Sequence, residues 1–207
     1  MGVLKASPEF ILASQSPRRR DLLKAAGFDF RVIVPDIDET PNPGESPARF
    51  ARRAARDKAR AVAARLPPSA RPRVVVACDT VVALGPRIFG KPRSASEAVR
   101  MLQALSGRTH EVISGLALLH GLPDGRSPRG LHSRSRTVRT RVRFRRLTTG
   151  EIKRYVASGE PMDKAGAYAI QEGAAGMVVS IRGSYTNVVG LPLAELIAWL
   201  TDAGVRH

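Results

Sequence analysis

The chain has 207 residues and a mass of 22.3 kDa, with 43% hydrophobic and 25% charged residues, a composition that excludes collagen-like and wholly disordered proteins. Its 34 lysines and arginines outnumber 18 acidic residues, and the formal net charge of +16 favours phosphorylated small molecules or polyanions as partners. A single cysteine, Cys78, excludes an internal disulfide. No apolar run is long enough for a membrane span or a secretion signal, so we expect a cytoplasmic protein with no membrane contact. The length predicts a single domain over residues 1–207.

Strand-like and helix-like segments alternate along the first half of the chain. The expected elements are a strand over 10–14, a helix over 17–26, a strand over 30–34, a loop over 36–45, a helix over 47–66 and a strand over 74–84. Both helices follow a Ser-Pro pair, Ser16-Pro17 and Ser46-Pro47, which suits the N-cap and the first helical position. The last segment is the most apolar of the chain and is rich in β-branched residues, which predicts a buried strand.

Helix caps and turn residues also divide the second half. The expected elements are a helix from a Ser94/Glu97 capping box to Leu105, a strand over 110–119, a loop over 121–130, a strand over 138–144, a helix from a Thr148/Glu151 capping box to about Ser158, and a helix over 191–203. Together these elements predict a mixed α/β fold.

Asp79 is a carboxylate inside the apolar run 74–84. A buried charge without a partner costs several kcal/mol, so this group must meet a cation, a metal or several donors. It either caps a turn at the end of the strand, or it acts as a base or metal ligand at a strand end, where α/β proteins place their sites. We favour the second interpretation.

Residues 13–20, with the sequence ASQSPRRR, lie where a strand leads into the N-terminus of a helix. Free amide groups, the hydroxyls of Ser14 and Ser16 and the arginine side chains would favour an anion there, although a capped helix with solvated arginines gives the same pattern. Residues 85–91 match the spacing of the front of a P-loop, but Pro92 stands where Ser or Thr must hold magnesium. We therefore reject a P-loop and keep Lys91 only as a possible phosphate contact.

Two loops could complete such a site. Asp36, Asp38 and Glu39 offer hard oxygen ligands for Mg²⁺ or Mn²⁺, although acidic loops are usually only solvated. Residues 159–171 place Asp, Lys, Tyr and Gln among glycines and a proline without regular periodicity, which is typical of a loop that lines a pocket. The four histidines show no metal-ligand spacing.

The most specific signal is a set of short motifs in chain order. They are Leu12-Ala13-Ser14 with Ser16-Pro17-Arg18-Arg19, Ala55-Arg56-Asp57-Lys58-Ala59, Ala77-Cys78-Asp79-Thr80-Val81, Gly90-Lys91-Pro92, Leu105-Ser106-Gly107-Arg108-Thr109-His110, Asp163-Lys164-Ala165-Gly166-Ala167-Tyr168 and Val189-Gly190-Leu191-Pro192-Leu193. With these motifs, which cover nearly the whole chain, the sequence resembles the Maf family of nucleoside triphosphate pyrophosphatases. The resemblance implies a mixed central β-sheet flanked by helices, with two lobes around a cleft.

The resemblance also implies an activity, the hydrolysis of a nucleoside triphosphate to the monophosphate and pyrophosphate with a divalent metal, Mg²⁺ or Mn²⁺. It implies Asp79 as the proton acceptor, which shares the metal site with Glu39. The phosphate-binding residues that it implies are Ser14, Arg19, Lys58 and Lys91, and the residues that select the base are Arg18, Thr80 and Gln171. This last set is similar to the branch of the family that acts on dTTP and UTP, and the branch that acts on methylated GTP ranks second. A homodimer is a further implication.

One region departs from the family pattern, the connector from about His120 to Arg136 and the strand after it, within the arginine-rich segment 126–146. Arginines at 139, 141, 143 and 145 alternate with the apolar face of that strand. This row could contact nucleic acid or a second copy, but a solvated edge strand is the simpler interpretation, and genome base composition alone can favour arginine. A rival to the enzyme is a basic module that binds nucleic acid or a division partner.

Overall fold

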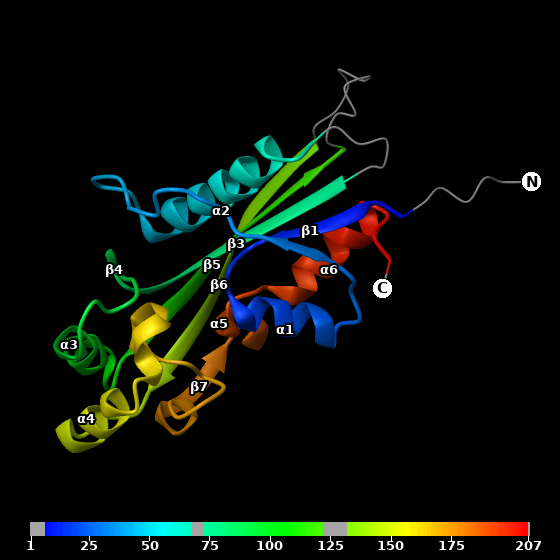
Figure 1. The fold of residues 1–207 in the computed structure, drawn as a ribbon. Helices are drawn as coiled ribbons and strands as arrows, with labels where there is room; N and C mark the ends of the chain where they lie inside the picture. The colour runs from blue at the N-terminus through cyan, green and yellow to red at the C-terminus, as the bar shows by residue number, and fades with distance from the viewer. Residues whose placement is uncertain (1–6, 68–72, 122–131, 207) are drawn as a thin grey trace, which may run out of the picture.

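The computed structural model describes residues 7–67, 73–121 and 132–206, which form one mixed β-sheet with helices on both faces (Figure 1). The strands are β1 (Glu9–Ala13), β2 (Arg31–Ile33), β3 (Arg73–Leu84), β4 (Arg87–Phe89), β5 (Thr109–His120), β6 (His132–Phe144) and β7 (Val178–Arg182). Their order is β2-β1-β3-β5-β6-β7, and β4 pairs with β3. β1 is parallel to β2 and β3, and the remaining pairs are antiparallel.

The helices divide into a layer on each face of the sheet and a group at one end of the long strands. They are α1 (Pro17–Ala25), α2 (Pro47–Ala64), α3 (Ala95–Leu105), α4 (Thr149–Ala157), α5 (Tyr185–Val189) and α6 (Leu193–Asp202), with 3₁₀ turns η1 (Glu160–Asp163), η2 (Ala165–Ala167) and η3 (Ala175–Met177). α2 packs on one face of β1, β3 and β5, and α1 and α6 pack on the other. None of the helices in the described residues is long and apolar enough to cross a membrane.

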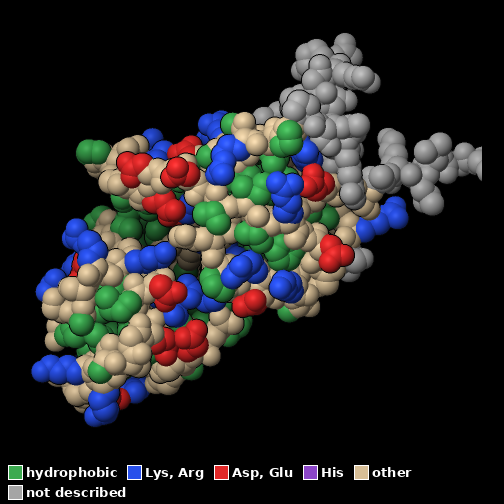
Figure 2. Space-filling model, in the orientation of Figure 1, with side chains coloured by type: hydrophobic (Ala, Val, Ile, Leu, Met, Phe, Trp, Pro, Cys, Tyr) green, Lys and Arg blue, Asp and Glu red, His purple; other side chains and the backbone are tan. Residues whose placement is uncertain are grey.

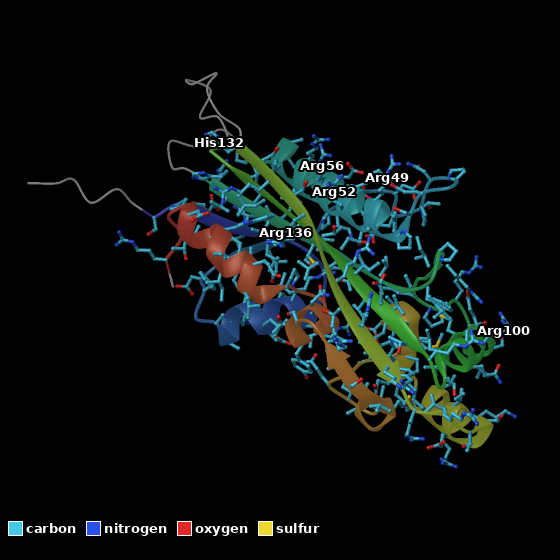
Figure 3. The ribbon with its side chains drawn as sticks, turned by 180° about the vertical axis from the view of Figure 1, so that it is seen from behind. Arg49, Arg52, Arg56, Arg100, His132 and Arg136 are labelled. Carbon is cyan, nitrogen blue, oxygen red and sulfur yellow. The ribbon has the colours of Figure 1, made fainter. Side chains whose placement is uncertain are left out.

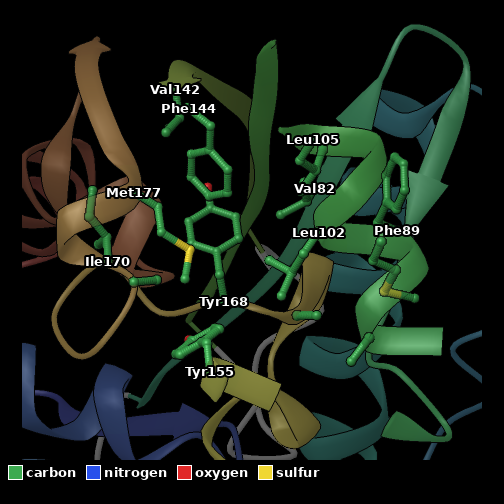
Figure 4. Packing of buried hydrophobic residues seen from close by; sticks show 14 of the residues in the cluster. Val82, Phe89, Leu102, Leu105, Val142, Phe144, Tyr155, Tyr168, Ile170 and Met177 are labelled. Atoms are coloured by element: carbon green, nitrogen blue, oxygen red, sulfur yellow. The ribbon is translucent and has the colours of Figure 1, made fainter. Parts of the chain in front are cut away.

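A second apolar cluster joins α3, α4 and the 3₁₀ turns to the far ends of β3, β5 and β6 (Figure 4). Tyr168, Phe144 and His110 stack edge to face at its centre, with ring centroids 4.8 to 5.5 Å apart. The long strands therefore connect two packed groups of elements, as the expected two lobes require (Figure 1).

The capping predictions are confirmed at most helices. The side chains of Ser46, Ser94 and Thr148 accept hydrogen bonds from backbone N–H groups three residues later, and Thr148 with Glu151 forms the reciprocal capping box. Two details were wrong. Ser16 makes no side-chain cap, and Glu97 accepts from the N–H of Arg93, so the expected box at Ser94 is not reciprocal.

Several short elements were not predicted. The strand β7 has mostly exposed side chains, and α5 has only 5 residues, so neither carries a periodic signal. Because β7 pairs with residues 141–144 of β6, the arginine-rich strand is not a simple edge strand over that part. Most of the loop expected over 121–130, and residues 126–131 of the arginine-rich segment, lie outside the described residues.

Candidate functional site

A cavity of about 660 Å³ lies between the two packed groups of elements, and basic and acidic side chains gather around a hollow on this face of the molecule (Figure 2). It is lined from the end of β1, from α1, α2 and β3, and from the loops after β4 and η2. Every residue that the family resemblance assigned to the site lines this cavity: Ser14, Arg18, Arg19, Glu39, Lys58, Asp79, Thr80, Lys91 and Gln171. Asp36 and Asp38, which the sequence analysis offered as ligands beside Glu39, are not among the lining residues. The structure thus brings together side chains that are far apart in the sequence.

The Asp79 carboxylate is almost fully buried and forms an ion pair with Lys58 from α2. Lys58 Nζ lies 2.6 Å from Asp79 Oδ1 and 2.9 Å from Glu39 Oε2, so the ammonium group bridges two carboxylates. The side chains of Lys58 and Asp79 are 7% and 8% exposed, whereas Glu39 is 49% exposed at the cavity. The buried charge therefore has the cationic partner that its burial requires.

The expectation that Asp79 lies at a strand end was wrong. β3 continues to Leu84, so Asp79 is in its interior. The neighbouring strand β1 ends at Ala13, which pairs with Ala77 of β3. No β1 residue therefore pairs with Asp79, two positions further along β3. The carboxylate reaches the cavity because its neighbour ends early.

Gly115 of β5 explains how α2 brings Lys58 so close to the sheet. Gly115 is the cross-strand partner of Asp79, and a Cβ atom on it would lie 2.0 Å from the carbonyl oxygen of Ala51 in α2. Only a residue without a side chain allows this approach. The helix therefore rests directly on the backbone next to Asp79.

Arg19 of α1 ties several parts of the cavity wall together. Its Nε donates to the carbonyl oxygen of Gly190 at 2.8 Å, Nη1 donates to Ser14 Oγ at 3.3 Å, and Nη2 donates to Thr80 Oγ1 at 3.2 Å. Thr80 Oγ1 also lies 2.8 Å from Ser114 Oγ and donates to the same Gly190 carbonyl at 3.2 Å. The guanidinium and the Thr80 hydroxyl are thus already engaged within the protein.

The remaining predicted residues lie at the rim of the cavity. Arg18 Nη1 is 3.7 Å from Asp163 Oδ2, which links α1 to η1 across the cavity. Lys91 and Gln171 are exposed, and neither forms a hydrogen bond or an ion pair with any residue that the structure describes. Both side chains are therefore free to contact a bound molecule.

The loop over 159–171 lines the cavity as predicted, but Lys164 and Tyr168 within it were not assigned to the site. Lys164 is buried and donates to the carbonyl oxygen of Glu160 and to Asp163 Oδ1, both at 2.8 Å, and this contact lowers the pKa of Asp163. The signal that could have indicated Lys164 is the pair Asp163-Lys164 in a loop of small residues. The pair Asp57-Lys58 has the same two residue types, but it lies in the helix α2.

Tyr168 packs on a buried histidine behind the cavity wall. Its hydroxyl lies 2.8 Å from His110 Nε2, and burial raises the pKa of Tyr168 and lowers the pKa of His110 to about 4. Both rings are therefore neutral at pH 7, and the contact is structural.

The carboxylates around Lys58 are ligands of the chemical type that binds divalent cations. Within residues 7–67, 73–121 and 132–206 no three His, Cys, Asp or Glu side chains cluster as a complete metal site. Glu39 and Asp79 nevertheless direct one oxygen each toward a single cationic point, which Lys58 Nζ holds. Mg²⁺ is commonly bound by one or two carboxylates together with phosphates, so the chemistry of these two side chains is compatible with such an ion.

Similarity to known proteins extends over almost the whole chain. Residues 9–203 match the sequence model of a family described as Maf-like protein. A protein of Myxococcus xanthus named dTTP/UTP pyrophosphatase is 50% identical over 94% of this chain and 92% of its own, and one of Geobacter sulfurreducens with the same name is 52% identical over 94% and 96%. Among solved structures, the Ham1 protein of Staphylococcus aureus is 16% identical over 94% of this chain and 98% of its own, with a TM-score of 0.49.

Proposed function

The chain belongs to the Maf-like protein family, and we propose that it hydrolyses dTTP and UTP to the monophosphate and pyrophosphate. The observation that carries the proposal is the buried Asp79 carboxylate, held by Lys58 in a cavity that Arg18, Arg19 and Lys91 also line. The names of the relatives from Myxococcus xanthus and Geobacter sulfurreducens support the same substrates.

In this proposal Asp79 is the base of the reaction. Water that attacks the α phosphorus must lose a proton, and a carboxylate within hydrogen-bond reach can accept it. The 2.6 Å contact with Lys58 holds the Asp79 side chain in one orientation. It also gives the buried carboxylate the cationic partner that its burial requires.

Cations around the cavity meet the charge of the triphosphate. Lys58 and the exposed Lys91 would contact phosphate oxygens, where negative charge builds up in the transition state. Three of the five N–H donors of Arg19 are engaged with Ser14, Thr80 and Gly190, so at most two remain for a phosphate. We therefore assign Arg19 mainly to the positioning of Ser14 and Thr80.

Glu39 and Asp79 would hold a divalent cation, Mg²⁺ or Mn²⁺, together with the phosphates. When bound, this ion would neutralise phosphate charge and polarise the bond that breaks. Lys58 would then share the two carboxylates with it.

Base selection is assigned to the rim of the cavity. The exposed amide of Gln171 can donate and accept at once, as the edge of a pyrimidine requires. Arg18 is held near Asp163, and Thr80 is committed to the Arg19 and Gly190 contacts, so both would shape the pocket around the base.

A substrate panel tests the proposal. The protein is incubated with Mg²⁺ or Mn²⁺ and each nucleoside triphosphate, including methylated GTP, and pyrophosphate is measured. Release from dTTP and UTP is expected, and Asp79→Asn should reduce it by at least about 10²-fold while Asp202→Asn, an exposed carboxylate on α6, should not. No pyrophosphate from any triphosphate would reject the enzyme, orthophosphate would indicate a different bond, and activity on methylated GTP alone would move the protein to that branch.

The resemblance to the family also supports a homodimer. Light scattering of the purified protein measures the mass directly, and a monomer at the concentrations of the assay would reject this part of the proposal.

A further inference from the structure

The outer side of α2 carries a row of arginines that the cavity does not use. Arg49, Arg52, Arg56 and Arg60 follow one another at intervals of three or four residues, so they share one side of the helix. All of them are exposed, and none forms an ion pair with the described residues. The row therefore presents unneutralised positive charge to solvent.

A second row lies beside it on β6. Arg139, Arg141 and Arg143 are exposed and point to one face of the sheet, because alternate residues of a strand share a face. Arg139 and Arg141 lie 3.4 and 3.9 Å from the same carboxylate, Glu111, and Arg143 has no ion pair among the described residues. One carboxylate thus partners two of the three arginines in this row.

The two rows form one surface, called here the arginine surface. Thr137, which shares the sheet face of the β6 row, pairs with Gly115, where the backbone of α2 touches the sheet. Further along, Arg56 and Arg60 line a shallow groove with Ser133 and Ser135 of β6. Figure 3 shows Arg49, Arg52 and Arg56 along α2, next to the long strand β6.

Arg145 was expected to extend the β6 row, but the structure removes it. Its Nη2 lies 2.7 Å from Glu151 Oε1, and its Nε donates to the carbonyl oxygen of Gly176. Neighbouring arginines are about 4.5 to 6 Å apart along α2 and about 7 Å apart along β6. The arginine surface therefore carries positive charge at regular intervals along α2 and along β6.

From this arrangement we propose that the arginine surface binds nucleic acid through its phosphate backbone, independently of base sequence. Arginine is the residue best suited to phosphate recognition, because its planar group donates two parallel hydrogen bonds to one phosphate. None of these arginines lines the cavity, so the surface is separate from the proposed nucleotide site.

The chemistry of the surface favours duplex nucleic acid over other anionic partners. No exposed Phe, Tyr or Trp lies on α2 or β6, so these elements lack the large aromatic rings on which single-strand binders stack bases. The large hydrophobic residues exposed in the described part of the chain are Val34, Val179 and Tyr185, and all lie outside α2 and β6. An amphipathic contact with a membrane needs such residues beside the basic ones. A second copy of the same surface would be repelled by like charge.

Fluorescence anisotropy with short labelled DNA and RNA duplexes tests the proposal between about 50 and 200 mM salt. The variant Arg52→Gln/Arg56→Gln/Arg143→Gln removes unpaired charges from both rows. We expect affinity to fall by at least about tenfold and the slope of log affinity against log salt to decrease by about 3, one for each lost phosphate contact.

The matched control is Arg100→Gln/Lys153→Gln/Arg154→Gln, which removes the same charge from exposed positions on α3 and α4. It should bind like the wild type, and both variants should retain the circular dichroism spectrum and the pyrophosphate release of the wild type. Equal weakening in the two variants would show that only net charge matters and would overturn the proposal. Unchanged binding by the first variant, or binding to anionic phospholipid vesicles without binding to duplexes, would overturn it as well.

Discussion

A single methyl group at Gly115 would test how α2 is held against the sheet. A Cβ atom there would lie 2.0 Å from the carbonyl oxygen of Ala51 and 2.6 Å from the Cα of Arg52. Ordinary contact begins near 3.4 Å, so Gly115→Ala must separate α2 from β5 by about 1.4 Å, the difference between 3.4 and 2.0 Å. Both partners are backbone, so no flexible side chain can absorb this shift.

The cost follows from that displacement. Overpacking a core usually destabilises a protein by about 1 to 3 kcal/mol, and the cost is larger when the backbone must move. We therefore expect Gly115→Ala to lower the free energy of unfolding by at least about 3 kcal/mol. Since Lys58 is on the same helix, the shift would also lengthen its 2.6 Å contact with Asp79, and a misplacement of about 1 Å can reduce a rate about 10²-fold.

Urea unfolding followed by the fluorescence of Trp199, the single tryptophan, measures the stability, and pyrophosphate release measures the rate. Gly176→Ala is the matched control, because a Cβ atom there meets nothing within 4 Å. If Gly115→Ala unfolds within about 0.5 kcal/mol of the wild type and keeps its rate, the close approach of α2 does not position Lys58.

Three further predictions concern single side chains. Lys58→Met should lower the free energy of unfolding by about 3 to 5 kcal/mol in urea, because Asp79 stays buried without its cation, and the loss should shrink when Asp79→Leu is added. Gln171→Glu should shift the substrate panel away from dTTP and UTP at unchanged stability; an unaltered profile would contradict its assigned role. Burial lowers the pKa of His110 from 6.5 to about 4, so the unfolded chain binds the proton first. The contribution of His110 to the free energy of unfolding should therefore be fully present above pH 6.5 and should fall by up to about 1.4 kcal/mol per pH unit toward pH 4. His110→Gln should remove this part of the pH dependence, which unfolding curves at several pH values measure.

Elements with a clear periodicity or a cap could be predicted from the sequence, and the short exposed ones could not. α2 was expected over 47–66 and runs from Pro47 to Ala64, because Ser46-Pro47 is a typical helix start and the alanines and arginines that follow are strong helix formers. β7 has 5 residues and mostly exposed side chains, and only its pairing with β6 defines it. Such pairing depends on contacts between distant segments, which a local pattern does not contain.

The residues of the site could be listed from the motifs, but the contacts between them could not. Asp79 required a partner because a carboxylate stood in an apolar run, and the ion pair with Lys58 fulfils that requirement. The expected strand over 74–84 already contained Asp79 in its interior, but the early end of β1, which opens the sheet beside Asp79, had no local signal. Gly115, which sets the distance of α2, likewise has no local signature.

The contacts of Gly190 show why a motif does not reveal the role of each residue. Its carbonyl oxygen accepts hydrogen bonds from Arg19 Nε, Thr80 Oγ1 and Cys78 Sγ, which come from α1 and β3. A carbonyl group after the short helix α5 needs such partners, because the last carbonyls of a helix have none within it. Arg19 therefore serves the wall of the cavity even before any phosphate binds. A loss of activity on replacing Arg19 would follow from either role. The free energy of unfolding of Arg19→Met separates them, because losing the contacts with Ser14, Thr80 and Gly190 lowers it, whereas losing a phosphate contact alone does not.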